Sequence, residues 1–220
     1  MARLPFADRR EAGALLGKAV RERLVGREAV VLGLPRGGVP VAYEVAAALG
    51  APLDVFVVRK LGVPGQEELA LGAIASGGVQ VLNEDLVREL GIGPEAIERI
   101  AERERHELER REHLYRDGRP PVEVRGRHVV VVDDGLATGA TMRAAVAALR
   151  AHGPASVTVA VPVAAEDTRD MFRLLADDII CLATPEPFRA VGLWYRDFRP
   201  TSDDEVRDLL AKASRAARGD

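Results

Sequence analysis

The chain has 220 residues, 47% of them hydrophobic, and a formal net charge of −3. This length suits one domain with additions, and the near-neutral charge argues against a nucleic-acid-binding protein. A single cysteine, Cys181, excludes an internal disulfide framework, and no apolar run approaches the ~20 residues of a membrane span. Because the first residues also lack the apolar stretch of a secretory signal, we expect a cytoplasmic protein without membrane contact.

Helical segments and short apolar runs alternate along the chain. Asp8 followed by Glu11 predicts a capping box that opens a helix ending near Leu24. Unbroken apolar runs predict buried strands at 29–34, 53–58, 129–132, 156–163 and 178–183, and the intervening segments predict helices at 40–49, 139–152, 168–176 and 202–216. This order predicts an α/β fold with a five-stranded parallel sheet flanked by helices.

A long segment separates the second expected strand from the third. Residues 61–78 are rich in glycine and small residues, and we interpret them as a loop with a weak hairpin. The segment from Pro94 to Tyr115 predicts a long charged helix with a thin apolar stripe, made by Ile97, Ile100, Ala101, Leu108 and Tyr115. The stripe favours packing on the rest of the chain, with packing on a second copy in a homodimer as the alternative.

The stretch VVVVDDGLATGAT, residues 129–141, joins an expected strand to an expected helix. Free N–H groups in its ATGAT loop, together with the helix dipole, favour an anion. Gly139 lets the backbone approach that anion closely, and Thr138 and Thr141 add hydroxyl donors. Neither the Walker A pattern nor the Rossmann glycine pattern is present. We therefore interpret the loop as a phosphate site.

Two adjacent carboxylates, Asp133 and Asp134, directly precede this loop. They would repel a phosphate, so they suit a ribose diol with a metal ion nearby, and a pair that merely caps a loop is the structural alternative. The strand, the two acids and the Gly/Thr loop resemble the 5-phosphoribosyl 1-pyrophosphate (PRPP) motif of the type I phosphoribosyltransferases. The resemblance extends over roughly residues 30–183.

This resemblance implies roles for individual residues of the motif. The two acids would hold the ribose hydroxyls and serve catalysis, and the loop from Ala137 would hold the 5-phosphate. The implied substrate-binding set is Asp133, Asp134, Gly135, Leu136, Ala137, Thr138, Gly139, Ala140 and Thr141.

The stretch GLPRGGVP, residues 33–40, resembles the pyrophosphate loop of the same family. The implied contacts are those of Pro35, Arg36, Gly37 and Gly38, with a catalytic role for Arg36. The resemblance also implies a cis peptide bond at Pro35–Arg36.

Basic residues end the second expected strand, as they do in several family members. Arg59 and Lys60 would bind the substrate, with a catalytic role for Lys60, although an ordinary charged strand end is an equal alternative. The implied cofactor is Mg²⁺, held mainly by PRPP near Asp133 and Asp134, and the four histidines indicate no metal site of their own.

The resemblance also implies a layout for a single domain. The core would span about 28–184, an inserted lid about 61–120, and a C-terminal hood with its helix about 185–220. An aromatic cluster in the hood offers Trp194 to stack on an acceptor, and a small hydrophobic core is the equal alternative. Ala137 stands where purine enzymes of the family often carry an acid, and no lysine follows the fourth strand, so we expect weak or no activity with hypoxanthine and guanine.

The predicted function is a phosphoribosyltransferase, a pentosyltransferase that moves the phosphoribosyl group of PRPP to a small nitrogenous-base acceptor and releases pyrophosphate. The alternative is a non-catalytic module that senses PRPP or a nucleotide. Arg36 and the long lid favour the enzyme, because a sensor of phosphoribosyl groups needs neither.

Overall fold

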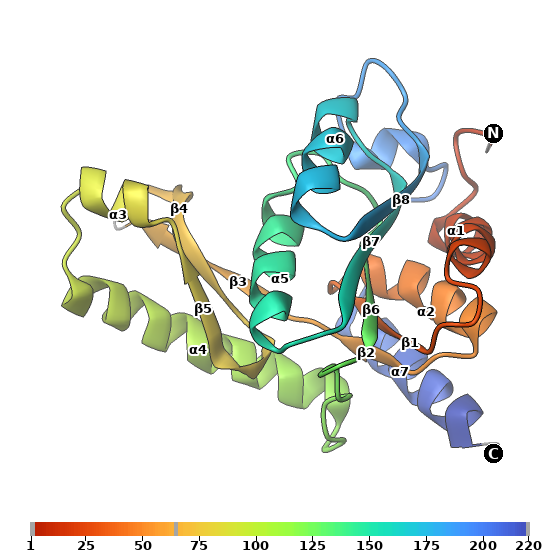
Figure 1. The fold of residues 1–220 in the computed structure, drawn as a ribbon, viewed down its shortest axis with the longest axis horizontal. Coiled ribbons are helices and arrows are strands. Elements are labelled where there is room, and N and C mark those ends of the chain that lie inside the picture. The colour runs from red at the N-terminus through yellow and green to blue at the C-terminus, as the bar shows by residue number, and fades with distance from the viewer. Residues whose placement is uncertain (1–2, 64–65, 219–220) are drawn as a thin grey trace.

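The computed structural model of the chain describes residues 3–63 and 66–218. Its centre is a five-stranded parallel sheet in the order β2-β1-β6-β7-β8, which confirms the predicted fold class (Figure 1). The strands are β1 (Ala29–Gly33), β2 (Leu53–Val55), β6 (His128–Val132), β7 (Ser156–Val163) and β8 (Asp178–Ala183).

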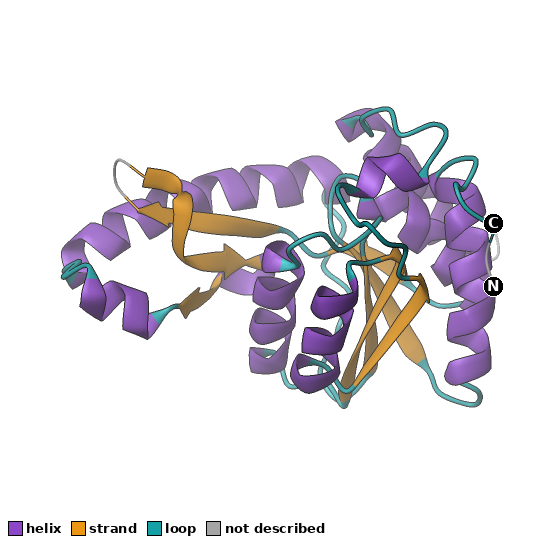
Figure 2. Ribbon diagram, turned by 90° about the horizontal axis from the view of Figure 1, so that it is seen from above, coloured by secondary structure: helices purple, strands orange, loops and turns teal. Residues whose placement is uncertain are grey.

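Helices cover both faces of this sheet (Figure 2). α1 (Arg9–Arg23) and α2 (Gly38–Leu49) lie on one face, and α5 (Ala140–Ala151) and α6 (Glu166–Leu175) lie on the other. Successive strand residues point to opposite faces, so Val30 packs toward α5 while Val31 packs toward α1 and α2. Burial on both faces explains why these strands are unbroken apolar runs.

Residues 58–63 and 66–116 form an arm that projects from this body (Figures 1 and 2). Its antiparallel sheet has the order β3-β4-β5. Its elements are β3 (Val58–Val63), β4 (Gln66–Ala75), the 3-10 turn η1 (Ser76–Gly78), β5 (Val79–Leu82), α3 (Glu84–Glu89) and α4 (Pro94–Arg116). The predicted apolar stripe of α4 is buried against β3, β4 and C-terminal helix α7, so the long helix packs on its own chain.

The arm corrects two predictions. The expected strand 53–58 divides, because β2 ends at Val55 and β3 begins at Val58. At the break the N–H of Phe56 donates to Gly33 O at 3.0 Å, and the N–H of Val57 donates to Ser76 Oγ at 2.8 Å. Segment 61–78 was expected to be a loop with a weak hairpin. The antiparallel pairing of β3 with β4 confirms the hairpin, but strands occupy most of the expected loop, and residues 64–65 lie outside the described residues. Apart from Asp54 the run 53–58 is apolar, and its pattern contains no signal for such a change of sheet.

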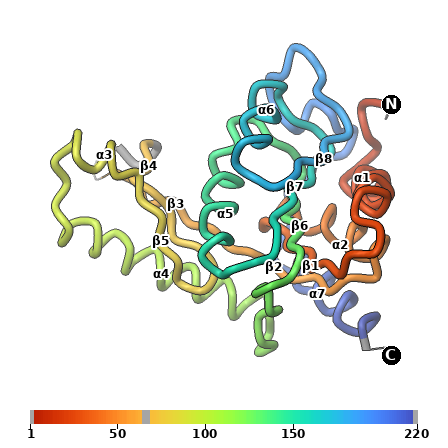
Figure 3. Tube along the Cα trace, in the orientation of Figure 1, coloured from red at the N-terminus to blue at the C-terminus, as the bar shows by residue number. Residues whose placement is uncertain are grey.

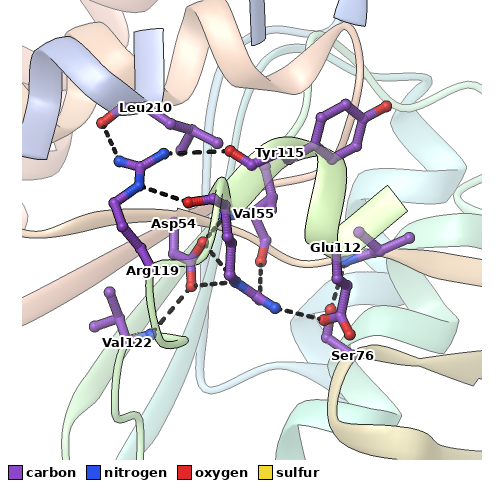
Figure 4. Close-up of polar contacts among 10 residues, drawn as sticks. Asp54, Val55, Ser76, Glu112, Tyr115, Arg119, Val122 and Leu210 are labelled. Carbon is purple, nitrogen blue, oxygen red and sulfur yellow. Dashed lines mark hydrogen bonds and ion pairs between the residues drawn. The ribbon is translucent and has the colours of Figure 1, made fainter. Parts of the chain in front are cut away.

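A buried polar network fixes the base of the arm (Figure 4). Arg116, the last residue of α4, places Nε 3.1 Å from both carboxylate oxygens of Asp54 and donates from Nη1 to Glu112 at 2.8 Å. Asp54 also accepts from the N–H of Val122 at 3.0 Å. Since the Asp54 and Arg116 side chains are only 8% and 12% exposed, this pairing compensates charges that burial would otherwise make costly.

The C-terminal part lies against the start of the chain (Figure 3). Residues 185–200, here called the hood, contain η2 (Val191–Trp194), and α7 (Asp203–Arg218) follows. Phe6 pairs with the hood through its N–H to Trp194 O at 2.9 Å and its O from Arg196 N at 2.8 Å. Phe6 and Tyr195 form the centre of a small aromatic cluster there, with ring centroids 5.6 Å apart. The segment around Phe6 and the hood therefore build one wall at the carboxyl ends of the strands.

Candidate active site

Adjacent strands bring the two glycine-containing loops together. β1 and β6 pair in register, with Gly33 opposite Val132, and the N–H of Leu34 donates to Val132 O at 2.9 Å. The loop after β1 therefore lies directly beside the acids that follow β6. The carboxyl ends of parallel strands are where ligands bind in such sheets.

Two glycines allow this close approach. A Cβ on Gly37 would lie 2.1 Å from Asp134 Oδ2, and a Cβ on Gly38 would lie 2.7 Å from Val132 O. Side chains at these positions would push the loop away from the acids. The Pro35–Arg36 peptide bond is cis, as predicted. We call residues 35–38 together with 133–141 the donor edge.

The acid pair sits in a partly desolvated environment. Burial raises the pKa of Asp133 well above its usual range, and repulsion from Asp134 raises it further. Burial also raises the pKa of Asp134, whereas the guanidinium of Arg9 opposes that rise. Asp133 Oδ1 accepts from the N–H of Asp134 at 2.9 Å. A cation or hydroxyl donors placed against such a pair would stabilise its ionised carboxylates.

The loop from Ala137 to Thr141 opens α5 as predicted. Gly139 is the N-cap residue in a left-handed conformation, with φ +69°, and a Cβ there would also lie 2.7 Å from Phe172. Thr168 on α6 donates from its hydroxyl to Ala137 O at 2.6 Å and braces the loop. Ala137, Thr138 and Thr141 are exposed, so the first N–H groups of α5 face a surface that an anion can reach.

The predicted basic residues are placed differently from one another. Arg36 lies in the pyrophosphate-like loop and reaches Asp203 at 4.0 Å, with both side chains about half exposed. Arg59 belongs to the arm, where it binds buried Glu104 at 2.7 Å instead of reaching the donor edge. Lys60 is exposed and lines a cavity of about 310 Å³ between β3, β4, β5 and α5, together with Thr141 and Arg143. The structure thus brings Lys60, but not Arg59, beside the phosphate loop.

The hood also contacts the donor edge, through Tyr195 and Val191. The hydroxyl of Tyr195 donates to Asp134 O at 2.5 Å, and Val191 lies where a Cβ on Gly135 would clash at 2.6 Å. Trp194 packs on Phe188, with ring centroids 6.3 Å apart, and among the described residues its buried Nε1 has no hydrogen-bond partner. Trp194 therefore belongs to the hood cluster and retains an unused donor.

Sequence reasoning missed one residue of the site, Arg9. Its Nε donates to Asp134 Oδ2 at 2.9 Å, although the two residues are 125 positions apart. A charged residue at the start of a helix is ordinary, so no sequence signal distinguished Arg9 from Arg10. Cys181 behaves as expected of a core residue, since burial raises the pKa of its thiol to about 11.

Comparison with known proteins decides the family. The family model described as "Phosphoribosyl transferase domain" matches residues 8–184. The chain belongs to the phosphoribosyltransferase family. Thus the two loops and the acid pair of this phosphoribosyltransferase chain lie inside the region that defines the family.

Individual relatives agree with this placement. A Mycobacterium tuberculosis (strain H37Rv) protein, provisionally named a phosphoribosyl transferase, is 51% identical over 96% of this chain and 47% of its own length. A ribose-phosphate pyrophosphokinase from Methanopyrus kandleri is 29% identical over 85% of this chain and 49% of its own length. This phosphoribosyltransferase chain therefore spans about half the length of the curated relatives it matches.

A solved structure shares almost the whole fold. The crystal structure of TT1426 from Thermus thermophilus has a TM-score of 0.85 and 46% identity, over 95% of this chain and 99% of its own. The arm and the hood of this phosphoribosyltransferase chain are therefore included in the similarity. Among the described residues there is no helix long and apolar enough to cross a membrane.

Proposed function

We propose that this chain binds PRPP at the donor edge and transfers its phosphoribosyl group to a nitrogenous acceptor with release of pyrophosphate. The observation that supports the proposal is the close approach of Gly37 and Gly38 to the acid pair, because these are the segments expected to bind pyrophosphate and ribose. The phosphate loop at Ala137–Thr141 lies directly beyond these acids in the chain. Each of the three parts of PRPP thereby has a group of suitable chemistry beside it.

The reaction is a substitution at C1 of the ribose. The bond from C1 to the pyrophosphate oxygen breaks and pyrophosphate leaves with the electron pair. The acceptor nitrogen forms the new bond to C1 and loses its proton to water or to the departing pyrophosphate. Positive charge accumulates on the ring as negative charge grows on the leaving group, so preorganised charges contribute most of the catalysis. Asp133 and Asp134 orient the ring hydroxyls, and Arg36 and Lys60 bind the leaving pyrophosphate.

Magnesium fits the donor edge as a shared ligand of protein and substrate. The described residues contain no cluster of three or more His, Cys, Asp or Glu that would hold a metal alone. Two adjacent carboxylates and a diphosphate match the way Mg²⁺ is usually bound, with few protein ligands and several waters. When bound, Mg²⁺ would neutralise charge on the leaving pyrophosphate, near Asp133 and Asp134.

The arm and hood suit the remaining tasks of such a transferase. The arm places Lys60 next to the phosphate loop, and its closure over the donor edge would exclude water, which otherwise hydrolyses PRPP. The hood contains Trp194, which packs on Phe188 and is the residue expected to stack on an acceptor. Ala137 has no group that transfers a proton, so hypoxanthine and guanine are expected to be poor acceptors.

The test is pyrophosphate release from PRPP and Mg²⁺ with a panel of acceptors, namely purines, pyrimidines and carboxylated heterocycles. We expect release with at least one acceptor, and its loss when Asp133 and Asp134 are both changed to Asn. A wild-type protein that binds no PRPP in calorimetry with Mg²⁺ would contradict the proposal. A kcat/KM of about 10⁴ M⁻¹s⁻¹ or more for hypoxanthine or guanine, an ordinary enzymatic value, would show the acceptor prediction to be wrong.

A further inference from the structure

Arg9 touches three separate parts of the site at once. Its Nε donates to Asp134 Oδ2 at 2.9 Å, and its Nη1 donates to Arg199 O in the hood at 2.9 Å. Its guanidinium carbon lies 3.9 Å from the ring centre of Phe198, also in the hood. The start of α1, the hood and the acid pair therefore meet at one side chain.

The surroundings of Arg9 exclude most solvent. The side chains of Arg9 and Asp134 are only 11% and 15% exposed. A nearly buried ion pair interacts more strongly than a surface pair, and leaving either member alone is costly. The pair also touches the pyrophosphate-type loop, since a Cβ on Gly37 would lie 2.1 Å from Asp134 Oδ2 and 3.4 Å from Arg9 Nε.

This geometry requires arginine rather than any cation. The planar guanidinium stacks on an aromatic ring while its edge donates in the same plane to a carboxylate and a carbonyl. A lysine has a point charge and no flat face, so it can satisfy only part of this arrangement. The adjacent Arg10 is exposed and forms no contact with Asp134, which makes it a matched comparison.

One oxygen of Asp134 is left available. Oδ2 accepts from Arg9, and apart from Arg9 no residue in the described part of the chain other than Asp134 itself donates to this carboxylate. The hydroxyl of Tyr195 holds the backbone oxygen of the same residue at 2.5 Å. Asp134 is thus restrained at its backbone and at one carboxylate oxygen, with the second oxygen free to accept from a ligand.

We propose that Arg9 is a positioning residue of the donor site, and this inference rests on the proposed function. It holds Asp134 Oδ2 so that Oδ1 is presented to a ribose hydroxyl of PRPP. Through Phe198 and Arg199 it also connects the position of the hood to the acid pair. Binding of the donor is therefore sensitive to a residue outside the motif that contacts the donor.

The first test compares Arg9→Gln, Arg9→Lys and the control Arg10→Gln by calorimetry with PRPP and Mg²⁺. Loss of groups that orient a ligand-binding side chain typically costs about 10- to 100-fold in affinity, and we expect a Kd increase of that size for Arg9→Gln. Arg9→Lys should recover part of the loss, and Arg10→Gln should bind as the wild type does. Thermal unfolding identifies a variant that fails to fold. If Arg9→Gln does not fold, the PRPP affinity of Arg9→Lys, which keeps the charge, is compared with that of the wild type instead.

A double-mutant cycle decides whether Arg9 acts through Asp134. In an Asp134→Asn background, Arg9→Gln should weaken PRPP binding by less than about threefold, because contacting residues that share one function are not additive. An undiminished effect in that background, or a Kd for Arg9→Gln equal to that of the wild type, would overturn the inference alone. Absence of PRPP binding by the wild type would overturn the proposed function first, and the inference with it.

Discussion

The donor edge with its partner Arg9, and the arm, both contain charged side chains, but the surroundings of these charges differ. At the donor edge Asp134 and Arg9 are nearly buried and touch backbone, ring and carboxylate partners. Along α4 most pairs lie within one helix, as in Arg110–Glu107, where the arginine side chain is 60% exposed. The same residue types therefore form a buried pair at the proposed binding site and solvated pairs along α4, and burial makes the difference.

The base of the arm differs from the rest of the arm, because its main ion pair is buried. There Arg116 and Asp54 are buried as deeply as the donor-edge pair, yet they contact strand β2 and α7 rather than a ligand-facing loop. Buried charge alone thus does not mark a binding site. Of these two networks, only the donor edge also has a carboxylate oxygen available to a ligand, Asp134 Oδ1, and an adjacent glycine loop, residues 35–38. These two features distinguish the proposed binding site from the base of the arm.

The largest expected effect comes from removing the charges of the donor edge. Changing Asp133 and Asp134 together to Asn should lower PRPP affinity by about 10³-fold, because both ribose-facing carboxylates are lost at a desolvated site. Calorimetry with Mg²⁺ measures the change. Circular dichroism provides the control for folding, and a folded double variant with wild-type affinity would refute the assignment of the acid pair.

The single variant Asp133→Asn tests, in the absence of ligand, how burial of the Asp133 carboxylate affects the stability of the protein. A carboxyl whose pKa is raised in the folded state binds more protons there than in the unfolded chain, so its contribution to stability falls as pH rises above its ordinary pKa. Asp133→Asn should therefore gain stability relative to the wild type from acidic to neutral pH. Denaturant unfolding at several pH values measures the difference, and a difference that shrinks with rising pH would contradict the raised pKa.

The next largest effect is expected at the base of the arm. Arg116→Met leaves Asp54 buried without its cation and should lower the free energy of unfolding by about 3 kcal/mol. The control Arg110→Met removes an exposed partner on the same helix and should leave stability unchanged. Equal losses in the two variants would show that the distinction between buried and exposed pairs is wrong here.

A smaller effect is expected from a single methyl group at the donor edge. Gly37→Ala places a Cβ 2.1 Å from Asp134 Oδ2, so the carboxylate must move, and PRPP affinity should fall by about tenfold, at the low end for a disturbed orienting group. The control Gly93→Ala lies at the start of α4, where no atom lies within 4 Å of the added carbon. Unchanged affinity in Gly37→Ala would mean that the loop does not bind the donor.

The smallest change in PRPP affinity is expected at Lys60, whose predicted role differs from that of its neighbour Arg59 in β3. Lys60→Gln should weaken PRPP binding by about two- to fivefold, as expected for an exposed charge, without changing stability. Arg59→Gln should lower stability, because it leaves buried Glu104 with only the longer contact to exposed Arg103, and should not change PRPP affinity. The reverse pattern in calorimetry and thermal unfolding would exchange the two assignments.

The sequence alone determined the parallel sheet and the donor motif. Strands buried on both faces must be continuously apolar, so runs such as 129–132 are visible without any tertiary information. The acids and the Gly/Thr loop are local as well, because the phosphate loop needs consecutive backbone N–H groups at one helix start. The cis Pro35–Arg36 bond was expected only because residues 33–40 resemble the pyrophosphate loop of a known family.

Only the tertiary structure decided which distant residues join this motif. The division of 53–58 between two sheets depends on Ser76 and Gly33, and the pairing of Arg59 with Glu104 depends on how α4 packs on β3. Arg9 reaches Asp134 across 125 positions because the hood folds back on the chain's first residues. Local propensity and spacing contain no information about such contacts, since burial and partner are set by packing between elements rather than by the residues themselves.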